Sequence, residues 1–430
     1  MKSKLVLYAV FCVMCSVASA QWLETTIYLP DTSGPYGLCY NPQHNKVYCA
    51  NWDGGNVTVI DGATNGVITT VAVGSAPTGL SRNSRNDKIY CTNAGSGTVT
   101  VIDGTTDTVL ATVAAGDGAC GICYNPQNNK VYCANAYSNN ITVIDGATDS
   151  VLAEVAAGEA PDNLCYNPQN NKVYCANTDT TSITVIDGAT DSVLATVTTG
   201  HSPNDLCYST ENDKVYCSNL FDDNVTVMDG ATDSIIATVA VGDWPYAICY
   251  NTQNNKVYCA NYRSDNVTVI DGAVDTVLRV LPVGINPWIL FYSEQNNKVY
   301  CSNSGGASLT VIDGETDQVS RTIGVGASPS HFCHNPVQNR VYVANWRGSS
   351  ISVLRDSAAG IEEIAIGKRR KATGGPTILS VSNVQSLESK VVYDALGRRA
   401  VNPRGGVYFV RSGPSAAGRQ PSAVTKVIIR

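Results

Sequence analysis

Residues 160–200 read APDNLCYNPQNNKVYCANTDTTSITVIDGATDSVLATVTTG, and close relatives of this stretch recur along most of the chain. The tyrosine of KVYCAN returns every 42 residues, at Tyr48, Tyr90, Tyr132, Tyr174, Tyr216, Tyr258, Tyr300 and Tyr342. Each unit has four short runs rich in β-forming residues, NLCY, KVYCAN, SITVID and SVLATV, separated by Pro, Asn, Asp and Gly. The pattern predicts a four-stranded antiparallel meander in each unit.

A single sheet of this kind cannot cover both of its own faces, so neighbouring units must stack on one another. A period near 42 residues with four strands per unit is typical of a β-propeller blade. A β-solenoid is the alternative, but its coils are normally shorter, and nothing in the sequence resembles a terminal cap. We therefore predict an all-β fold, a β-propeller built from four-stranded blades.

The number of blades follows from how the ring closes. The run WLETTIYLP (22–30) resembles the fourth strand of a unit but precedes the first unit, whereas the last clear third strand is SISVL (350–354). Eight periods of 42 residues span 22–357, so we predict eight blades, with the N-terminal strand completing the last one. A seven-bladed ring, or closure by IEEIAIG (361–367), is the alternative.

The units, with KVYCAN followed by NVTVIDGATD, resemble the YVTN-type β-propeller repeat, with Cys where that repeat usually has Val. The resemblance covers about 22–367. It implies the propeller fold and an exported or surface location, as in surface-layer-like proteins. It implies no shared reaction, because function is not fixed by fold.

The chain divides into four predicted segments. Residues 1–20 carry Lys2 and Lys4, the apolar run LVLYAVFCVMC and ASA before Gln21, which predicts a signal peptide and an exported protein. The propeller is predicted over 21–367, a basic linker over 368–377 and a small β segment over 378–430. No later run reaches the length of a membrane-spanning helix, so we expect no membrane span.

The last segment resembles the C-terminal sorting domain of type IX secretion cargo. Its runs YDALGR, GGVYFVR and KVIIR match that pattern at Tyr393, Asp394, Gly397, Arg398, Gly406, Tyr408, Val410, Arg411, Lys426 and Arg430. The resemblance implies secretion by that route and attachment at the cell surface. The alternative is a small β appendage with no role in sorting.

The net charge of −7 is unevenly distributed. From Lys368 onward twelve Lys or Arg oppose two acidic residues, which leaves about −19 for residues 21–367. An acidic body cannot displace counterions from a phosphate backbone, so we expect no nucleic-acid partner.

The fourteen cysteines that follow residue 20 are concentrated at two repeat positions ten residues apart, as in Cys165 and Cys175. A hairpin centred midway between them would set the two opposite each other, within reach of a disulfide. However, the two positions are occupied independently from unit to unit. We therefore favour packing as small apolar residues, and intra-hairpin disulfides remain the alternative.

Candidate catalytic groups are few. The repeated Asp of VIDGATD is read as turn chemistry, since copies spread around a ring cannot meet at one substrate. CGIC (120–123) is a lone CxxC pair. His331 and His334 form the best constellation, which would need Asp205 beside them to act in catalysis. We expect no catalytic residue, no metal site and no cofactor.

Two sets of loops vary between units, those joining the second and third strands and those entering the first strands. In a meander both lie on one rim, here called the variable rim. It carries exposed aromatic residues beside carboxylates and amides, a combination suited to peptides, glycans or cationic surfaces. The candidate ligand-binding residues are Tyr36, Trp52, Tyr137, Trp244, Tyr246, Tyr262, Arg263, Trp288 and Trp346.

The sequence therefore predicts an exported, monomeric, non-enzymatic propeller that acts as a binding or scaffold module. Its partner is expected to be a protein, peptide or glycan at the cell surface. The alternative is a lactonase-like or cofactor-dependent propeller enzyme.

Overall fold

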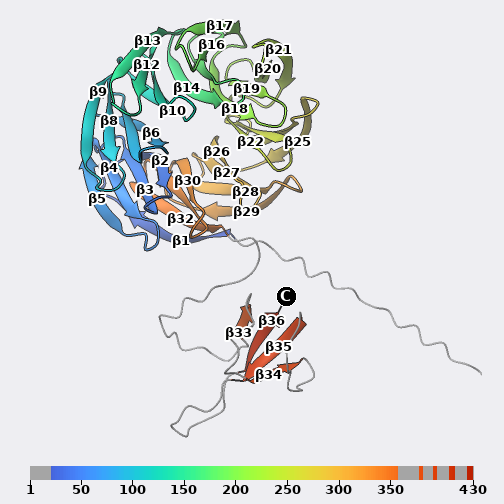
Figure 1. The fold of residues 1–430 in the computed structure, drawn as a ribbon. Coiled ribbons are helices and arrows are strands. Elements are labelled where there is room, and N and C mark those ends of the chain that lie inside the picture. The colour runs from blue at the N-terminus through green and yellow to red at the C-terminus, as the bar shows by residue number, and fades with distance from the viewer. Residues whose placement is uncertain (1–20, 357–376, 381–390, 395–405, 412–423, 430) are drawn as a thin grey trace, which may run out of the picture. The chain divides into compact units, whose positions relative to one another are not determined.

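The computed structural model describes residues 21–356, 377–380, 391–394, 406–411 and 424–429. Residues 21–356 form one compact unit, a closed ring of eight four-stranded antiparallel sheets (Figure 1). The predicted eight-bladed β-propeller is confirmed, and the seven-bladed and solenoid alternatives are wrong. No helix that could span a membrane occurs among these residues.

The first strand of each blade lies nearest the centre of the ring (Figure 1). We number blades 1 to 8 by these strands, which are β2 (Pro35–Asn41), β6 (Pro77–Asn83), β10 (Ala119–Asn125), β14 (Pro161–Asn167), β18 (Pro203–Ser209), β22 (Pro245–Asn251), β26 (Pro287–Ser293) and β30 (Pro329–Asn335).

The second and third strands form the buried middle of each blade. The second strands are β3 (Lys46–Asn51), β7 (Lys88–Asn93), β11 (Lys130–Asn135), β15 (Lys172–Asn177), β19 (Lys214–Asn219), β23 (Lys256–Asn261), β27 (Lys298–Asn303) and β31 (Arg340–Asn345). The third strands are β4 (Asn56–Asp61), β8 (Thr98–Asp103), β12 (Asn140–Asp145), β16 (Ser182–Asp187), β20 (Asn224–Asp229), β24 (Asn266–Asp271), β28 (Ser308–Asp313) and β32 (Ser350–Asp356). Val, Tyr and Cys side chains from both faces of these strands are inaccessible to solvent, because each blade packs against two neighbours.

The outermost strands complete the blades. In blades 1 to 7 they are β5 (Val67–Ala72), β9 (Val109–Ala114), β13 (Val151–Ala156), β17 (Val193–Thr198), β21 (Ile235–Ala240), β25 (Thr276–Pro282) and β29 (Gln318–Gly324). Blade 8 takes its outermost strand from the other end of the sequence, β1 (Gln21–Tyr28).

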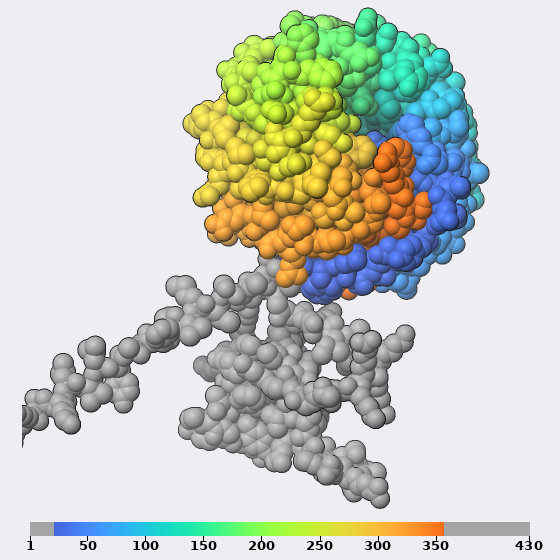
Figure 2. All heavy atoms as spheres, turned by 180° about the vertical axis from the view of Figure 1, so that it is seen from behind, coloured from blue at the N-terminus to red at the C-terminus, as the bar shows by residue number. Residues whose placement is uncertain are grey.

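Closure by the N-terminal strand is confirmed. β1 pairs antiparallel with β32, from Gln21 opposite Asp356 to Tyr28 opposite Ser350. In Figure 2 the N-terminal residues, in blue, lie directly beside the last blade, in orange. The rival strand at 361–367 and the predicted propeller boundary at 367 lie outside the described residues, as do the predicted signal peptide and all of the predicted linker except Thr377, which begins a strand.

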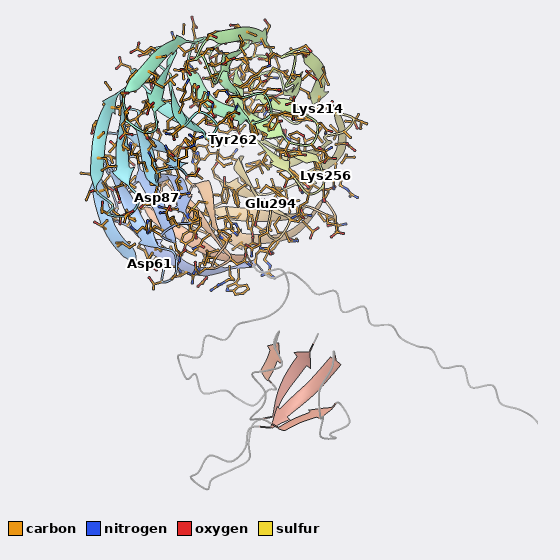
Figure 3. All side chains as sticks on the ribbon, viewed as in Figure 1. Asp61, Asp87, Lys214, Lys256, Tyr262 and Glu294 are labelled. Carbon is orange, nitrogen blue, oxygen red and sulfur yellow. The ribbon has the colours of Figure 1, made fainter. Side chains whose placement is uncertain are left out.

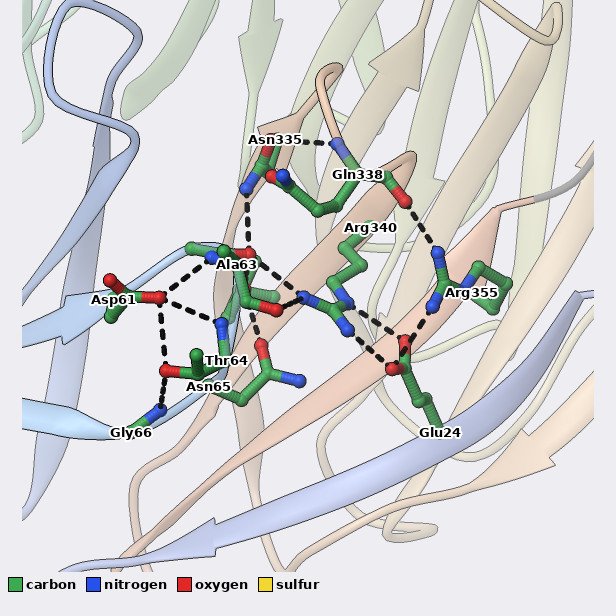
Figure 4. Close-up of polar contacts among 12 residues, drawn as sticks. Glu24, Asp61, Ala63, Thr64, Asn65, Gly66, Asn335, Gln338, Arg340 and Arg355 are labelled. Carbon is green, nitrogen blue, oxygen red and sulfur yellow. Dashed lines mark hydrogen bonds and ion pairs between the residues drawn. The ribbon is translucent and has the colours of Figure 1, made fainter. Parts of the chain in front are cut away.

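Glu24 fastens this closing strand (Figure 4). Its carboxylate accepts hydrogen bonds from Arg340 at 2.5 and 2.9 Å and from Arg355 at 3.1 Å. Burial alone would raise the pKa of Glu24, but the bonds and charges of the two arginines outweigh it and lower that pKa. Arg340 also donates to the carbonyl groups of Gly62 and Ala63 in blade 1, so one cluster joins β1, blade 8 and blade 1.

Six successive blade interfaces share one polar contact. In the third of them, Lys130 Nζ and Tyr132 Oη of β11 both donate to Asp191 of the next blade, each at 2.7 Å. Asp191 has a φ of 61°, a conformation that Asp and Asn adopt more readily than other residues with a side chain. Lys214 and Lys256, labelled in Figure 3, make the same contact to Asp275 and Asp317.

The interface between blades 7 and 8 differs. Lys298 pairs with Asp313 of its own blade at 2.5 Å, and Tyr300 Oη is buried without a hydrogen-bond partner in the described part of the chain. Here Asp356 replaces the glycine that follows the third strand in other blades, and it accepts a hydrogen bond from Ser293 Oγ at 2.7 Å. The seventh interface is therefore chemically distinct from the six before it.

None of the fourteen cysteines of the described residues is bonded to another, which supports the packing interpretation. The expectation that the hairpin sets the paired cysteines opposite each other is wrong. In blade 4, Cys165 lies opposite Tyr174, and Leu164 lies opposite Cys175. Because adjacent positions on a strand face opposite ways, this offset of one residue turns the two thiols to opposite faces of the sheet.

We expect the thiols to be inert in the folded protein. Burial raises the pKa of Cys39 and Cys123 to about 12, and the pKa of every other described cysteine is also raised by burial. The thiol, rather than the reactive thiolate, therefore predominates at neutral pH. Titration with a thiol reagent at pH 7.5 should label few cysteines in the native protein and all of them in urea without reductant. Fewer thiols in urea would reveal disulfides.

The second unit contains a separate four-stranded sheet. Its strands are β33 (Thr377–Ser380), β34 (Val391–Asp394), β35 (Gly406–Arg411) and β36 (Val424–Ile429), in the order β33-β36-β35-β34. β33 runs parallel to β36, and the other neighbours are antiparallel. The predicted β segment therefore contains strands at three of the quoted runs, and its sorting role stays a prediction.

Candidate functional site

The variable loops line a cavity at one end of the ring. The cavity has a volume of about 610 Å³, and its wall combines residues of the first strands with residues of the loops that follow the second strands. Tyr36, Trp52, Tyr137 and Tyr246 of the predicted set belong to it. We call it the central cavity.

A β-bulge at the start of every first strand shapes this cavity. In blade 3, Ala119 pairs with Asn135 and Ile122 with Cys133, so Cys120 and Gly121 lie opposite the single residue Ala134. A bulge bends the strand and redirects the side chains at that point. The residues within the bulge therefore reach the cavity.

The bulge is also where the units differ most. From blade 1 to blade 8 its residues are Tyr36 and Gly37, Thr78 and Gly79, Cys120 and Gly121, Asp162 and Asn163, Asn204 and Asp205, Tyr246 alone, Trp288 and Ile289, and Ser330 and His331. Most of them line the central cavity. An otherwise repetitive fold thus presents a different side chain from almost every blade to one shared cavity.

Two carboxylates occupy neighbouring blades in this wall. Asp205 accepts hydrogen bonds from the backbone N–H groups of Leu206 and Ile248, both at 2.9 Å. Burial nevertheless raises the pKa of Asp205 to about 6, and the nearby charge of Asp162 adds to the shift. The pKa of Asp162 is also raised by burial. Both carboxyl groups therefore titrate above the usual range for aspartate.

The predicted histidine constellation is not assembled. His331 lines the central cavity together with Asp205, and its ring centroid lies 4.6 Å from that of Tyr36. His334 lies further along β30, with its ring 6.3 Å from Phe291, and is not part of the cavity wall. Burial lowers the pKa of His331 to about 4, so this imidazole is neutral at physiological pH.

The repeated polar residues hold turns, as expected. Asp145 Oδ1 accepts hydrogen bonds from the N–H groups of Ala147 and Thr148 at 2.7 and 2.8 Å. The fully buried Asn135 donates to Asn140 Oδ1 and Thr142 Oγ1 across the loop after the second strand. These side chains maintain the scaffold that supports the cavity.

Seven aromatic rings form a continuous series on the variable rim. Successive centroids lie 5.9 to 6.3 Å apart. The series, which we call the aromatic arc, is Phe221, Trp244, Tyr262, Tyr246, Trp288, Tyr36 and Trp52. Apart from the exposed Phe221, these rings are partly buried, so they are held in place and still present a face to solvent.

A second cavity of about 440 Å³ adjoins the arc. Trp244, Tyr246, Tyr262, Trp288, Trp346 and Arg347 contribute to its wall. Tyr246 lines both cavities. Arg263 lies outside both walls, with its guanidinium carbon 3.4 Å from the centroid of the Trp244 ring.

The structure thus places every predicted ligand-binding residue at one end of the ring, in the two cavities or against the arc. Sequence reasoning did not single out Thr78, Asn163 and Asn204, which also line the central cavity. Their signal was present in the sequence, because polar residues at these strand positions differ from unit to unit while flanking residues repeat.

Neither a protein-family model nor a curated protein matches the sequence. Among solved structures, the chain is similar to the hydrazine synthase of Kuenenia stuttgartiensis, with 20% identity and a TM-score of 0.55 over 68% of this chain and 99% of that one. It is also similar to the dihydro-heme d1 dehydrogenase NirN, with 14% identity and a TM-score of 0.64 over 79% of this chain and 76% of that one. At these identities the likeness supports the propeller fold alone.

A haem-type cofactor does not fit the central cavity. Its wall offers one imidazole, His331, which packs against Tyr36. The carboxylates of a tetrapyrrole would face Asp162 and Asp205, and none of the residues that form this wall is Lys or Arg. Among the described residues, no three His, Cys, Asp or Glu side chains are grouped to hold a metal ion.

Proposed function

We propose that this protein is an exported, non-enzymatic binding module whose variable rim takes a protein, peptide or glycan at the cell surface. The observation that carries the proposal is the aromatic arc, which borders two cavities at the end of the ring where the units differ. Rigid aromatic faces beside polar groups provide large contact areas at a small entropic cost, as binding sites require.

The rest of the ring supports a scaffold role. Six blade interfaces repeat the same contact between Lys, Tyr and Asp, whereas nearly every blade contributes different residues to the cavities. The signal-peptide pattern and the resemblance to exported propellers support a location outside the cytoplasm. The resemblance of residues 378–430 to a sorting domain supports surface attachment.

Replacement of Trp288 by alanine should weaken ligand binding at least tenfold. This ring lies between Tyr246 and Tyr36 in the arc and lines the second cavity, so its loss divides the arc into two parts. The ligand would be found by probing glycan and peptide arrays with the full chain, and affinities would then be measured by calorimetry.

Tyr28→Ala is the matched control, because this exposed ring lies on β1 outside both cavities. Equal affinities for Trp288→Ala and the unmodified chain would remove the arc from ligand binding and overturn the proposal.

The second candidate is an enzyme of the lactonase-like or cofactor-dependent type. Asp205 favours it, because a carboxyl group with a pKa of about 6 in a cavity has the properties of a general base. Both similar structures also carry enzyme names. Hydrolysis of a lactone or ester by the full chain, lost in Asp205→Asn, would favour this candidate over the binding module.

A further inference from the structure

The central cavity has an unbalanced charge. Three carboxylates line it, those of Asp162, Asp179 and Asp205, and its wall contains no Lys or Arg among the described residues. Asp179 is exposed at the mouth, whereas Asp162 and Asp205 belong to the bulges of the first strands.

Several enclosed carboxylates elsewhere in the ring have basic partners, and the fully buried Asp356 instead accepts hydrogen bonds from Ser293 and Gln21. Asp107 pairs with Lys46 at 2.8 Å, Asp87 with Arg82 at 2.9 Å and Glu24 with two arginines. In the part of the chain that the structure describes, no ion pair joins Asp162 or Asp205 to a basic group. A desolvated charge is unfavourable unless it is paired.

The other ionisable groups of the wall cannot supply the missing positive charge. His331 is neutral because burial lowers its pKa to about 4. Burial raises the pKa values of Cys120, Tyr36 and Tyr246, so these groups are also neutral at physiological pH. Any positive partner of these carboxylates must therefore come from outside the wall.

Aromatic rings of the same wall suit such a partner. Tyr36 and Tyr246 line the cavity with the two carboxylates, and a cation is attracted to the face of an aromatic ring. The rim already shows this interaction, since the guanidinium of Arg263 lies over Trp244.

We propose that the central cavity binds a cationic side chain, an ammonium or guanidinium group, presented by a peptide segment of the ligand. This inference rests on the proposed binding function and narrows its ligand. The aromatic arc alone would suit a neutral glycan equally well. The unpaired carboxylates distinguish the two, because a neutral sugar leaves Asp162 and Asp205 without a counter-charge, whereas a basic side chain neutralises them.

The test compares two peptides that differ in one charge, acetyl-Gly-Ser-Arg-Ser-Gly amide and the same peptide with citrulline in place of arginine. Titration of the full chain at pH 7.5, followed by tryptophan fluorescence, should give at least tenfold higher affinity for the arginine peptide. Asp162→Asn should remove most of this difference. The asparagine keeps the shape of the side chain and removes its charge.

Asp243→Asn is the matched control, an exposed carboxylate on the same rim that does not line the cavity. We expect its affinities to stay within twofold of those of the unmodified chain. If Asp243→Asn weakened binding as much as Asp162→Asn, general attraction to an acidic surface would explain the result, and the inference would be wrong.

A pH series provides a second readout. Asp205 gains a proton as the pH falls through about 6, and the pKa of Asp162 is also raised. Because protonation removes the negative charge that attracts the guanidinium, affinity for the arginine peptide should fall between pH 7.5 and pH 5. Equal binding of both peptides, or of neither, overturns the inference. If neither peptide binds but a glycan binds and is lost in Trp288→Ala, the proposed function stands without it.

Discussion

A chain that lacks residues 21–28 should fail to form a stable ring. Those residues are the whole of β1, so their loss leaves β32 with an open edge and exposes Ile351 and Val353, both now fully buried. It also leaves Arg340, whose side chain is 8% exposed, without the carboxylate of Glu24. Removing one partner of a buried pair alone costs about 3–5 kcal/mol, so we expect a total loss above about 5 kcal/mol.

The measurement is urea-induced unfolding followed by circular dichroism, on proteins that begin at residue 21 or at residue 29. A synthetic peptide of residues 21–30 added to the shorter chain should restore part of the stability, because β1 is held against β32 by non-covalent contacts. Unchanged unfolding midpoints for the two proteins would show that β1 does not hold the ring closed.

Gly121→Ala should destabilise the ring by about 3 kcal/mol, the upper part of the usual range for overpacking. A β-carbon at this position would lie 1.7 Å from the backbone oxygen of Asp162 in the next blade. A backbone atom cannot move aside as a flexible side chain can. The strand β14 must therefore shift, which displaces Asp162 from the cavity wall.

Gly324→Ala is the control, since an added β-carbon there meets no atom within 4 Å. It should leave stability unchanged or raise it slightly, because alanine restricts the unfolded chain. The prediction would be contradicted if both alanine variants unfolded at the same urea concentration as the unmodified protein.

The fold could be predicted from the sequence because the same four-strand pattern recurs in eight units. A single KVYCAN is ambiguous, but its return every 42 residues between turn residues leaves few architectures. The closing strand followed from the same comparison, since WLETTIYLP matches a fourth strand without a blade of its own.

The positions of the cysteines show that spacing along the sequence does not determine the register of two paired strands. The distance of ten residues between Cys165 and Cys175 fits a hairpin centred between them, yet the ladder pairs Cys165 with Tyr174. Register depends on the conformation of the loop, in which Asn171 adopts a φ of 52°. A shift of one residue is invisible in composition and reverses which face each thiol occupies.

The loop residues on the rim of the candidate site could be predicted from the sequence, but the arrangement of residues inside the cavity could not. Loop residues such as Trp52 were identified because they vary where the rest of the unit repeats. The presence of both Asp162 and Asp205 in one cavity was not foreseen, because the two lie at different positions of neighbouring units, and the sequence does not show that both bulge residues line the cavity. Likewise, only the three-dimensional arrangement separates His331 from His334.

The repeated contact between blades bears on what fixes the number of blades in the ring. Because six interfaces use the same Lys, Tyr and Asp partners, none of them identifies which blade it joins. A tandem duplication or deletion of one 42-residue unit within blades 1 to 6 would leave all remaining interfaces chemically complete. The two interfaces of the last blade differ from these six, through Ser293 and Asp356 on one side and through Arg340 and Glu24 on the other. The gene can therefore gain or lose whole blades without new contacts, while the size of the central cavity changes with each one.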